Sequence, residues 1–462
     1  MIVNLELALT AGEIARAVGG IYEGDPSKPI LRVVTDSREA TEGDLFFALV
    51  GERCDGEAYV GEAVAKGAVA VSKRAGAGVL LVRDVKEALL CLAKEYRHRL
   101  PSLTHVIGVT GSVGKTTTKE FLAALLSKKY RVHATEKNYN NELGVPLTVL
   151  SAPKETEVLI VEMGMNHAGE IAPLSKAVCP TLAIITGIGT AHIGNLGSRE
   201  MIAAAKCEIL VGMRDGPVLV PSEEPLLEKL PNRLSVSTEN PMADFFLMPI
   251  RTDITGSVAD FYHGERTIPA LSLRAPGKHL LTALSFAVST AVLLGLSDGE
   301  IVDGVSLIHD DKIRQSIHKI GELTIFEDAY NASLESVTAA IETLDLFRGM
   351  KKSALIGDML ELGGKTEEYH RKVGEALFSH GFSSLYLYGV YAPFTAAGAR
   401  DAGFPADDIY ENTDPLSPIV TAKEILLHAE EKEILLVKGS RGVHLERVIA
   451  AMKEIMEGKT NA

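Results

Sequence analysis

Apolar and polar positions follow two long, regular series along the chain. From Thr104, apolar runs rich in β-branched residues alternate with segments of helical spacing, and these runs are HVIGVT, EVLIVEMG and TLAIITGIG. A second series begins after about Asp311, with the runs LTIFED, SALIGD, SLYLYG and ILLVKGS. Uninterrupted apolar strands that alternate with helices are typical of parallel sheets covered on both faces. The pattern therefore predicts two parallel α/β units in tandem.

The other regions have a weaker pattern. The first hundred residues alternate short strands and helices, and Thr10 with Glu13 has the spacing of a helix-capping box. Between the two series, the stretch from Pro221 to Pro269 is richer in proline, aspartate and other polar residues. We expect this stretch to form smaller β structure at the edge of the central unit.

Composition narrows the classes of function. The 462 residues are 46% apolar and 23% charged, which is enough to bury several cores, and roughly 150 residues per domain suggests about three domains. The 47 basic and 61 acidic residues give a net charge of -14, which repels a phosphate backbone, so we do not expect nucleic acid as a partner. The four cysteines are scattered without metal-ligand spacing, which favours a reducing compartment and predicts a cytoplasmic location.

Two segments bear on membrane association. The stretch from Leu280 to Leu296 carries no charge over 17 residues, which is the lower limit for spanning a bilayer. Four hydroxyl side chains interrupt it, at Thr282, Ser285, Ser289 and Thr290. We expect a helix buried between other elements. The N-terminal stretch has no basic region and carries Glu6 and Glu13, so we expect neither a signal peptide nor a membrane span.

A glycine-rich break separates a buried strand from a helix in the stretch HVIGVTGSVGKTTTKEFLAALL, residues 105–126. A strand, a glycine loop and a helix N-terminus in that order form an anion site, because free backbone N–H groups and the positive end of the helix dipole converge there. Gly111 and Gly114 allow the backbone to approach a phosphate. Lys115 can then place a positive charge near the terminal phosphates, and Thr116 a hydroxyl on Mg²⁺.

This loop differs from the usual P-loop spacing, because Val109 takes the place of the first glycine and Gly108 comes one residue early. The alternative is a glycine-rich turn that binds nothing. The lysine and threonines directly after a buried strand favour the nucleotide site. The expected ATP-binding residues of the loop are Thr110, Gly111, Ser112, Gly114, Lys115, Thr116 and Thr117.

Candidate metal ligands follow the next two strands. Glu162 comes directly after the run VLIV, at the carboxyl end of a central strand, where open α/β sheets bind ligands. His192 follows the next strand on a loop with glycines. Each alone can be a structural or solvated side chain, but together with Thr116 they predict a shared Mg²⁺ site. Lys206 lies on an alanine-rich helix, and its surroundings alone suggest a solvated lysine.

Eight stretches in a fixed order resemble the Mur ligase family of bacterial cell-wall synthesis. They run from about residue 33 to residue 442 and so cover nearly the whole chain. Several are specific to the branch that joins D-alanyl-D-alanine to UDP-N-acetylmuramoyl-tripeptide. The stretches are TDSREATEGDLFFALVGERCDG, GVTGSVGKTTTKE, NYNNELGVPLTVL, VEMGMNHAGEI, AHIGNLGSREMIAAAKCEIL, DAYNASLESVTAAIETL, IGDMLELG and VKGSRG.

The resemblance implies a fold, a reaction and its partners. The fold is α/β with three domains: a small N-terminal UDP-substrate domain at 1–100, a central ATP-binding domain with a doubly wound parallel P-loop sheet at 101–312, and a C-terminal Rossmann-like domain at 313–462. The reaction uses ATP and two Mg²⁺ ions to convert the tripeptide carboxylate into an acyl phosphate. The amine of D-alanyl-D-alanine then displaces phosphate. We expect a monomer.

The resemblance also assigns residues. It makes Lys206 the lysine that is often carbamylated and then binds a second Mg²⁺, so the expected metal ligands are Thr116, Glu162, His192 and Lys206. Lys115, Glu162, His192 and Lys206 become the catalytic residues. Contacts to the UDP-substrate are implied for Ser37, Arg38, Asn140 and Asn141. Further nucleotide contacts are implied for Arg314, Asp328, Tyr330 and Asn331.

The chain departs from the family pattern at three places. Leu280 and Ala283 stand where the family usually has asparagines that help to seat the nucleotide, in the segment GKHLLTA. Ser333 and Leu334 replace the asparagine and proline of a YNANP motif, and Ile313 replaces a glycine before the hinge arginine. The phosphate-loop, metal and lysine positions are retained.

Other functions remain open on the sequence. A related ligase could take D-alanyl-D-lactate, D-alanyl-D-serine or a single amino acid as its acceptor, although the branch motifs argue against the last. A P-loop ATPase or switch would hydrolyse ATP without an acceptor, but it leaves the N-terminal motif without a role. A non-catalytic nucleotide-binding scaffold would release no ADP under any condition.

Overall fold

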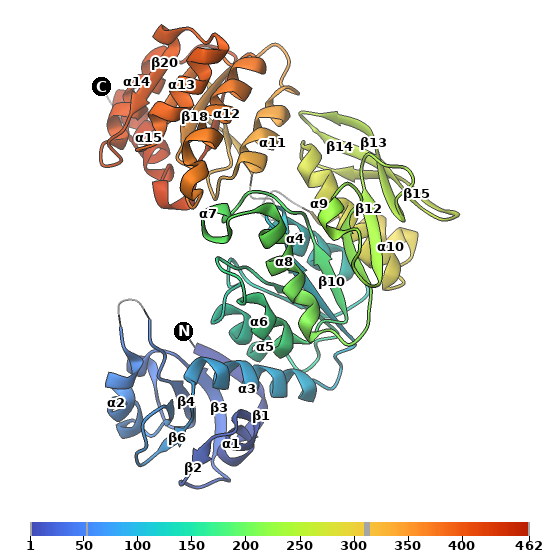
Figure 1. The fold of residues 1–462 in the computed structure, drawn as a ribbon, viewed down its shortest axis with the longest axis vertical. Coiled ribbons are helices and arrows are strands. Elements are labelled where there is room, and N and C mark those ends of the chain that lie inside the picture. Colours follow the sequence, from blue (N-terminus) through green and yellow to red (C-terminus); the bar gives the residue numbers. More distant parts are fainter. Residues whose placement is uncertain (1, 52–53, 309–314, 461–462) are drawn as a thin grey trace.

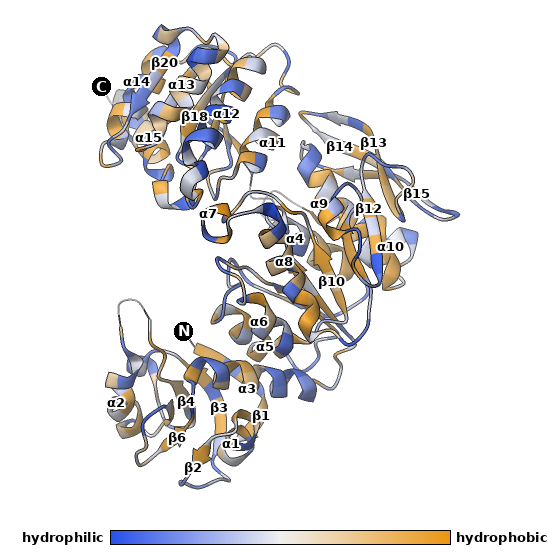
Figure 2. Ribbon diagram, in the orientation of Figure 1, coloured by the Kyte–Doolittle hydropathy of each residue, from blue (hydrophilic) through white to orange (hydrophobic). Residues whose placement is uncertain are grey.

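The chain is built around three sheets that follow one another in sequence. The computed structural model describes residues 2–51, 54–308 and 315–460, and in these residues the sheets have six, nine and six strands. The three units form a crescent, with the N-terminal and C-terminal units at its two ends and the central unit between them (Figure 1). Apolar residues concentrate in the strands, such as β10 of the central sheet (Figure 2). The expected α/β fold with three units is confirmed.

The N-terminal sheet has the order β1-β3-β4-β5-β6-β2. β1 pairs antiparallel with β3 and β2 antiparallel with β6, while the strands between them are parallel. The predicted capping box of Thr10 and Glu13 begins the first helix. The elements are β1 (Ile2–Thr10), α1 (Ala11–Val18), β2 (Ile21–Tyr22), β3 (Pro29–Val34), η1 (Ser37–Glu39), β4 (Asp44–Phe47), η2 (Gly56–Tyr59), α2 (Val60–Ala65), β5 (Val69–Ser72), β6 (Val79–Leu81) and α3 (Val85–Arg99).

The central sheet has the order β15-β14-β13-β12-β11-β10-β7-β9-β8. Its strands are parallel from β8 to β13, and β13, β14 and β15 are antiparallel. The runs predicted to form a parallel sheet, β7, β9 and β10, are parallel, and the antiparallel strands lie at the outer edge, where short hairpins need no crossover helix. The strands are β7 (His105–Thr110), β8 (Val132–Ala134), β9 (Val158–Glu162), β10 (Leu182–Ile185), β11 (Val218–Pro221), β12 (Arg233–Ser237), β13 (Phe245–Asp253), β14 (Gly256–His263) and β15 (Arg266–Leu273).

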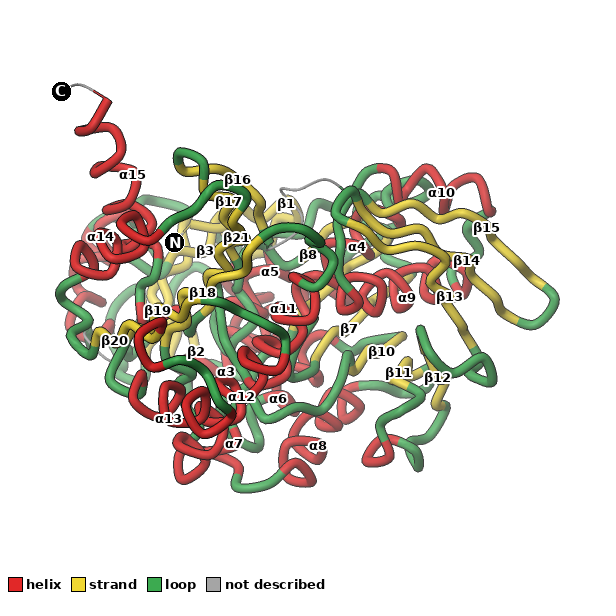
Figure 3. The backbone as a smooth tube through the Cα atoms, turned by 90° about the horizontal axis from the view of Figure 1, so that it is seen from above, coloured by secondary structure: helices red, strands yellow, loops and turns green. Residues whose placement is uncertain are grey.

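The proline-rich stretch forms the β structure expected of it: β12 continues the central sheet outward as a parallel strand, and β13, β14 and β15 follow as hairpins (Figure 3). The uncharged segment after Leu280 lies in α9, whose side chains are mostly buried, as expected. None of the helices within the described residues is long and apolar enough to cross a membrane. The helices of the central unit are α4 (Lys115–Leu126), α5 (Gly144–Leu150), α6 (Ile171–Val178), α7 (Ile193–Leu196), α8 (Arg199–Cys207), η3 (Glu208–Gly212), η4 (Pro225–Leu227), α9 (Lys278–Leu293) and α10 (Asp298–Ser306).

The third sheet has the order β16-β17-β21-β18-β19-β20, with β16 antiparallel and the rest parallel. The elements are β16 (Ser316–Ile320), β17 (Leu323–Glu327), α11 (Leu334–Leu344), β18 (Lys351–Gly357), η6 (Gly363–Lys365), α12 (Thr366–Ser379), β19 (Ser384–Tyr388), α13 (Ala392–Ala402), η7 (Ala406–Asp408), β20 (Ile409–Asn412), α14 (Pro418–His428), β21 (Glu433–Lys438), η8 (Arg441–Val443) and α15 (Glu446–Thr460).

The exact domain boundaries stay predictions. The one proposed between residues 100 and 101 lies between α3 and β7. The other, between 312 and 313, falls outside the described residues.

Candidate active site

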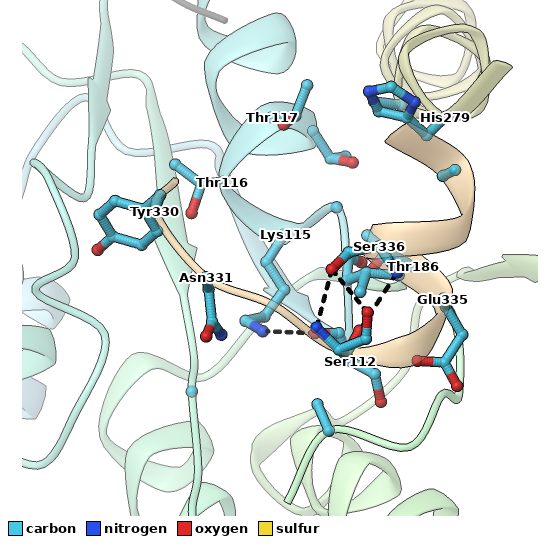
Figure 4. A pocket seen from close by; sticks show the side chains of 18 of the residues that line it. Ser112, Lys115, Thr116, Thr117, Thr186, His279, Tyr330, Asn331, Glu335 and Ser336 are labelled. Carbon is cyan, nitrogen blue, oxygen red and sulfur yellow. Dashed lines mark hydrogen bonds between the residues drawn. The ribbon is translucent and has the colours of Figure 1, made fainter. Parts of the chain in front are cut away.

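A cavity of about 460 Å³ lies where the central and third units meet. The loop before α4, the ends of β9 and β10, and the start of α9 line it from the central unit. The segment from Asp328 to Ala339 and Lys438 line it from the third unit. In Figure 4, Tyr330 and Asn331 lie on the side of Thr116 and Lys115, and His279 and Ser336 lie across from them.

The phosphate loop has the backbone that its glycines predict. Gly111 has φ 144° and Gly114 has φ 81°, both in the region that side chains disfavour. A Cβ atom at Gly111 would also lie 2.1 Å from Oγ1 of Thr186, so only glycine fits there. The Lys115 ammonium folds back on the loop, where Nζ donates to the carbonyl of Gly111 at 2.8 Å. The same ammonium is thus close to where phosphates would sit.

Thr186, at the end of β10, holds this loop from the neighbouring strand. Its Oγ1 donates to the carbonyl of Val113 at 2.5 Å, and the amide of Ser112 donates to the carbonyl of Gly187 at 2.9 Å. On the other side, Oγ1 of Thr110 donates to the carbonyl of Met163 at 2.8 Å. The loop is therefore fixed to both adjacent strands.

Glu162 is the centre of a hydrogen-bonded group at the end of β9. Its side chain is 1% exposed, and Oε2 accepts from Oγ1 of Thr116 at 2.8 Å. Oε1 accepts from Nδ2 of Asn140 at 2.7 Å, and the Glu162 amide donates to Oγ1 of Thr135 at 3.0 Å. Asn141 instead uses Oδ1 to accept from the amides of Leu143 and Gly144, which starts α5.

His192 lines the same cavity and makes contact with the third unit. It caps the start of α7 with φ 64°, and its Nδ1 lies 2.5 Å from Oε2 of Glu361. Nδ1 is buried, and although this carboxylate oxygen is near, the two groups are not aligned as a hydrogen bond, so the described part of the chain gives Nδ1 no hydrogen-bond partner. The contact with His192 is the main factor that lowers the pKa of the Glu361 carboxyl, against the opposing effect of burial.

The two units also touch through backbone near this contact. The amide of Gly194 donates to the carbonyl of Glu361 at 3.1 Å. A Cβ atom at Gly194 would lie 2.6 Å from the amide nitrogen of Gly363, so the two loops leave no space for a side chain. A second link joins Oγ1 of Thr190 to Oε2 of Glu335 at 3.0 Å.

Lys206 is fully buried on α8, contrary to the solvated lysine that its surroundings in the sequence suggest. Its Nζ has no hydrogen-bond partner among the described residues. Burial, with a smaller effect of the Lys115 charge, holds the pKa of the Lys206 amine well below its ordinary value, against the attraction of nearby carboxylates. Desolvation disfavours the ammonium because its charge loses contact with water. The surroundings of Lys206 therefore favour the neutral amine over the ammonium more strongly than water does.

The third unit contributes polar groups at the carboxyl ends of β17 and β21. Nζ of Lys438 lies 2.8 Å from Oδ2 of Asp328 and also donates to the carbonyl of Asn331 at 2.8 Å. The Arg441 guanidinium lies over the Tyr330 ring at 5.4 Å from its centroid. The Lys438 contacts fix the backbone that carries Asn331 into the cavity.

One wall of the cavity is apolar. Leu280, Ala283 and Phe286 on α9 line it together with Ala339 on α11. At the start of α9, Nε2 of His279 lies 2.8 Å from Nε2 of Gln315, and burial lowers the pKa of the imidazole. The neutral ring can therefore accept from the amide of Gln315, the first described residue after the 309–314 gap.

The structure brings many of the predicted residues together. Those that line the cavity are Ser112, Gly114, Lys115, Thr116, Thr117, Asn140, Glu162, His192, Asp328, Tyr330 and Asn331. Thr110, Gly111, Asn141 and Lys206 are not among the lining residues.

The predicted UDP contacts lie elsewhere, in the N-terminal unit. Ser37 is buried and Oγ donates to Glu62, whereas the exposed Arg38 pairs with Asp36 at 2.6 Å. Arg314 lies outside the described residues.

Sequence reasoning missed several lining residues, among them Thr186, His279, Glu335 and Lys438. Lys438 and His279 stand in motifs noted above, VKGSRG and GKHLLTA, and Lys438 ends an apolar strand, which is a usable signal. Thr186 and Glu335 give no comparable signal, because their roles depend on contacts with distant segments.

The donor groups fit Mg²⁺. Hydroxyl and carboxylate oxygens are the ligands that Mg²⁺ prefers, and Thr116 and Glu162 already share a hydrogen bond at one rim of the cavity. No cluster of three or more histidine, cysteine, aspartate or glutamate side chains is close enough to hold a metal by itself in residues 2–51, 54–308 and 315–460. Such a site needs oxygens from a nucleotide or a modified Lys206 as well.

Comparison with known proteins matches the chain along most of its length. Residues 29–97 match the catalytic domain of the Mur ligase family, residues 109–291 the Mur ligase middle domain, and residues 314–441 the Mur ligase glutamate ligase domain. The UDP-N-acetylmuramoyl-tripeptide–D-alanyl-D-alanine ligase of Bacillus subtilis is 36% identical over 92% of this chain and 93% of its own length. The enzyme of the same name from Escherichia coli is 30% identical over 97% and 99%.

Solved structures agree with these matches. A crystal structure of MurF from Acinetobacter baumannii superposes with a TM-score of 0.88 at 32% identity, over 98% of this chain and all of the other. MurF ligase from Thermotoga maritima in complex with ADP gives a TM-score of 0.81 at 29% identity, over 92% of this chain and 98% of the other. The similarity therefore extends across all three units.

Proposed function

The chain belongs to the Mur ligase family, and from this premise we propose how its residues carry out the reaction. It is an ATP-dependent, ADP-forming ligase that joins D-alanyl-D-alanine to UDP-N-acetylmuramoyl-tripeptide in peptidoglycan synthesis. The observation that carries the proposed mechanism is one cavity lined both by a phosphate loop and by the third unit. ATP can thus be held between two units while the other substrates approach from the open side of the crescent.

The first step activates a carboxylate. A carboxylate repels nucleophiles and has no good leaving group, so one of its oxygens attacks the γ-phosphorus of ATP and ADP leaves. The work is mainly electrostatic. Lys115 and the loop amides hold the phosphates, and Asn140 and Thr116 fix the Glu162 carboxylate.

In the second step, the amine of D-alanyl-D-alanine attacks the acyl carbon. The C–N bond forms, the amine loses its proton, and phosphate departs with the electron pair of the C–O bond. Contacts between the units, such as Thr190 with Glu335, close the cavity on one side and limit the entry of water. Exclusion of water protects the acyl phosphate from hydrolysis.

Mg²⁺ is the expected metal, with Thr116, Glu162 and His192 as the residues that would hold it. When bound, it neutralises charge on the phosphate oxygens. A neutral Lys206 can attack CO₂ to form an N–C bond and release one proton, which yields a carbamate. This change turns a potential cation into an anion that suits a second Mg²⁺. The orphaned, buried Nζ supports this assignment.

The remaining parts of the chain have roles in this scheme. The base of ATP packs against the apolar wall of Leu280, Ala283 and Phe286, in place of asparagine contacts. Arg314, Asp328, Tyr330 and Asn331 are the remaining nucleotide contacts. Ser37 and Arg38 hold the UDP end of the substrate in the N-terminal unit. Free cysteines and the use of ATP support a cytoplasmic location, and a cavity completed by one chain supports a monomer.

The test is ADP and phosphate release by the purified protein with ATP and Mg²⁺. UDP-N-acetylmuramoyl-tripeptide and D-alanyl-D-alanine are added separately and together. We expect turnover only with both, together with an amide product of the summed mass less water. Turnover with neither would favour a simple ATPase, and no ADP with any acceptor, D-alanyl-D-lactate and D-alanyl-D-serine included, would favour a nucleotide-binding scaffold.

The phosphate loop gives a second, simpler check. Lys115→Ala removes the ammonium that faces the phosphates, so nucleotide affinity falls by about tenfold or more. Fluorescence titration with a labelled ATP measures it, and Lys128→Ala, an exposed lysine beyond α4, is the control.

A further inference from the structure

Glu361 makes a contact that the reaction scheme above does not use. It lies in the third unit, after β18, and its Oε2 is 2.5 Å from Nδ1 of His192 in the central unit. Its own backbone has φ 64°, a left-handed conformation that a non-glycine residue rarely adopts. The backbone bond from Gly194 to the Glu361 carbonyl holds this turn against α7. Figure 1 shows α7 at the junction of the two units.

The contact decides which imidazole nitrogen is available to the cavity. A neutral imidazole has one N–H donor and one acceptor, and the bond made by one nitrogen fixes the state of the other. A carboxylate oxygen 2.5 Å from Nδ1 favours a proton on that nitrogen, because two lone pairs would repel each other at this distance, and the lone pair is then left on Nε2. Metal-binding histidines are commonly oriented in this way by a carboxylate on the second nitrogen.

We infer that Glu361 is a positioning residue that reaches across from the third unit and sets His192 for metal binding. This inference rests on the proposed function, because it assumes that His192 holds Mg²⁺. It adds a link between two events. The His192 ring has the required tautomer and orientation only when the third unit is docked, so the affinity for the metal depends on docking.

The link is reciprocal. If docking raises the affinity for the metal, the metal stabilises docking by the same factor. The site of phosphoryl transfer is thus completed only after the unit that excludes water is in place. Premature formation of acyl phosphate in an open enzyme would be disfavoured.

The first test reads the tautomer of His192 without any metal. In ¹⁵N-histidine-labelled protein, the His192 signals are assigned by their loss in His192→Gln. We expect the Nδ1–H form in the wild type and a shift toward Nε2–H in Glu361→Ala. Glu361 is about half exposed, so its replacement does not disturb a core.

The second test measures Mn²⁺ affinity by electron paramagnetic resonance in the presence of ADP. Loss of such a carboxylate partner costs about 10–100-fold in metal affinity, and we expect at least tenfold for Glu361→Ala. Glu361→Gln keeps an acceptor oxygen and should lose less. Glu367→Ala, an exposed glutamate of α12, is the matched control.

An unchanged tautomer with unchanged Mn²⁺ affinity in Glu361→Ala would overturn the inference, and so would an equal loss in Glu367→Ala. The ligase assay on the wild type is read separately. If the wild type makes no amide while Glu361→Ala still changes the tautomer and the Mn²⁺ affinity, the proposed function fails and the positioning role stands.

Discussion

Two buried lysines of the central unit, Lys119 and Lys206, have opposite surroundings. Lys119 on α4 is 1% exposed, and its Nζ donates to the carbonyl of Thr135 at 2.6 Å and lies 2.7 Å from Glu120. Lys206 on α8 is fully buried, and its Nζ has no hydrogen-bond partner in the described chain. Burial is therefore the same in both, and the partners differ.

The difference separates a structural lysine from a reactive one. Lys119 ties α4 to the end of β8, where Oγ1 of Thr135 in turn accepts from the amide of Glu162. Lys206 contributes no such link, and a buried amine without partners costs stability. A position that costs stability in this way is a candidate for chemistry.

The largest effect is expected on catalysis by Lys206→Ala. Loss of the group that would carry the carbamate removes charge at the site of phosphoryl transfer, and we expect kcat to fall about a thousandfold. Added formate or acetate should restore part of the rate, because a free carboxylate can take the place of the carbamate. Steady-state ADP release measures both, and wild-type turnover in this variant would exclude the carbamate.

Lys119→Met should instead act on stability. The Thr135 carbonyl is left without its donor, and an unsatisfied buried acceptor costs about 1–3 kcal/mol. Urea denaturation gives the change in the free energy of unfolding. At temperatures where the variant is folded, we expect its kcat to stay within about threefold of the wild type, since Lys119 does not line the cavity. A stable variant with a large loss of kcat would reverse the roles.

Lys206→Met should stabilise the protein at neutral pH, by about 1 kcal/mol. The pKa of Lys206 is lower in the folded state, so the unfolded chain binds more protons below its ordinary pKa. The free energy of unfolding of the wild type must then rise with pH in this interval. The advantage of the variant should shrink as pH rises toward 10. Thermal unfolding in CO₂-free buffer between pH 7 and 10 tests the sign, and a constant difference would contradict it.

The smallest effect is expected for Glu120→Gln. Its carboxylate is 31% exposed, and partly exposed ion pairs contribute about 0–1 kcal/mol. The Thr135 carbonyl still holds Lys119 in this variant. A loss as large as that of Lys119→Met, measured by the same urea titration, would show that Glu120 and not Thr135 is the main partner.

Much of the site could be predicted from strand positions. Apolar runs locate parallel strands, and their carboxyl ends meet at one edge, which is why Lys115, Thr116, Glu162 and His192 were expected near one another. The cavity lining is in accord with that expectation. The β structure at the outer edge of the central sheet was expected, but its antiparallel direction was not predicted, because the polar stretch gives no signal for how its strands pair.

Other features depend on distant parts of the chain. The pattern of an alanine-rich helix does not indicate that Lys206 is enclosed, and only the family resemblance suggested its role. The contact between Glu361 and His192 joins two units, and the two residues are 169 positions apart in the sequence. No local period carries such a contact, because it depends on how whole units dock.

The close approach of Gly194 and Gly363 has a practical consequence. Gly194 lies within α7, so the helix itself would tolerate a methyl group at this position. The obstacle would be the backbone of Gly363 and Glu361 in the third unit. A single added carbon would act as a spacer between two intact halves. We expect such a chain to hold the third unit away from α7 while each unit keeps its own fold.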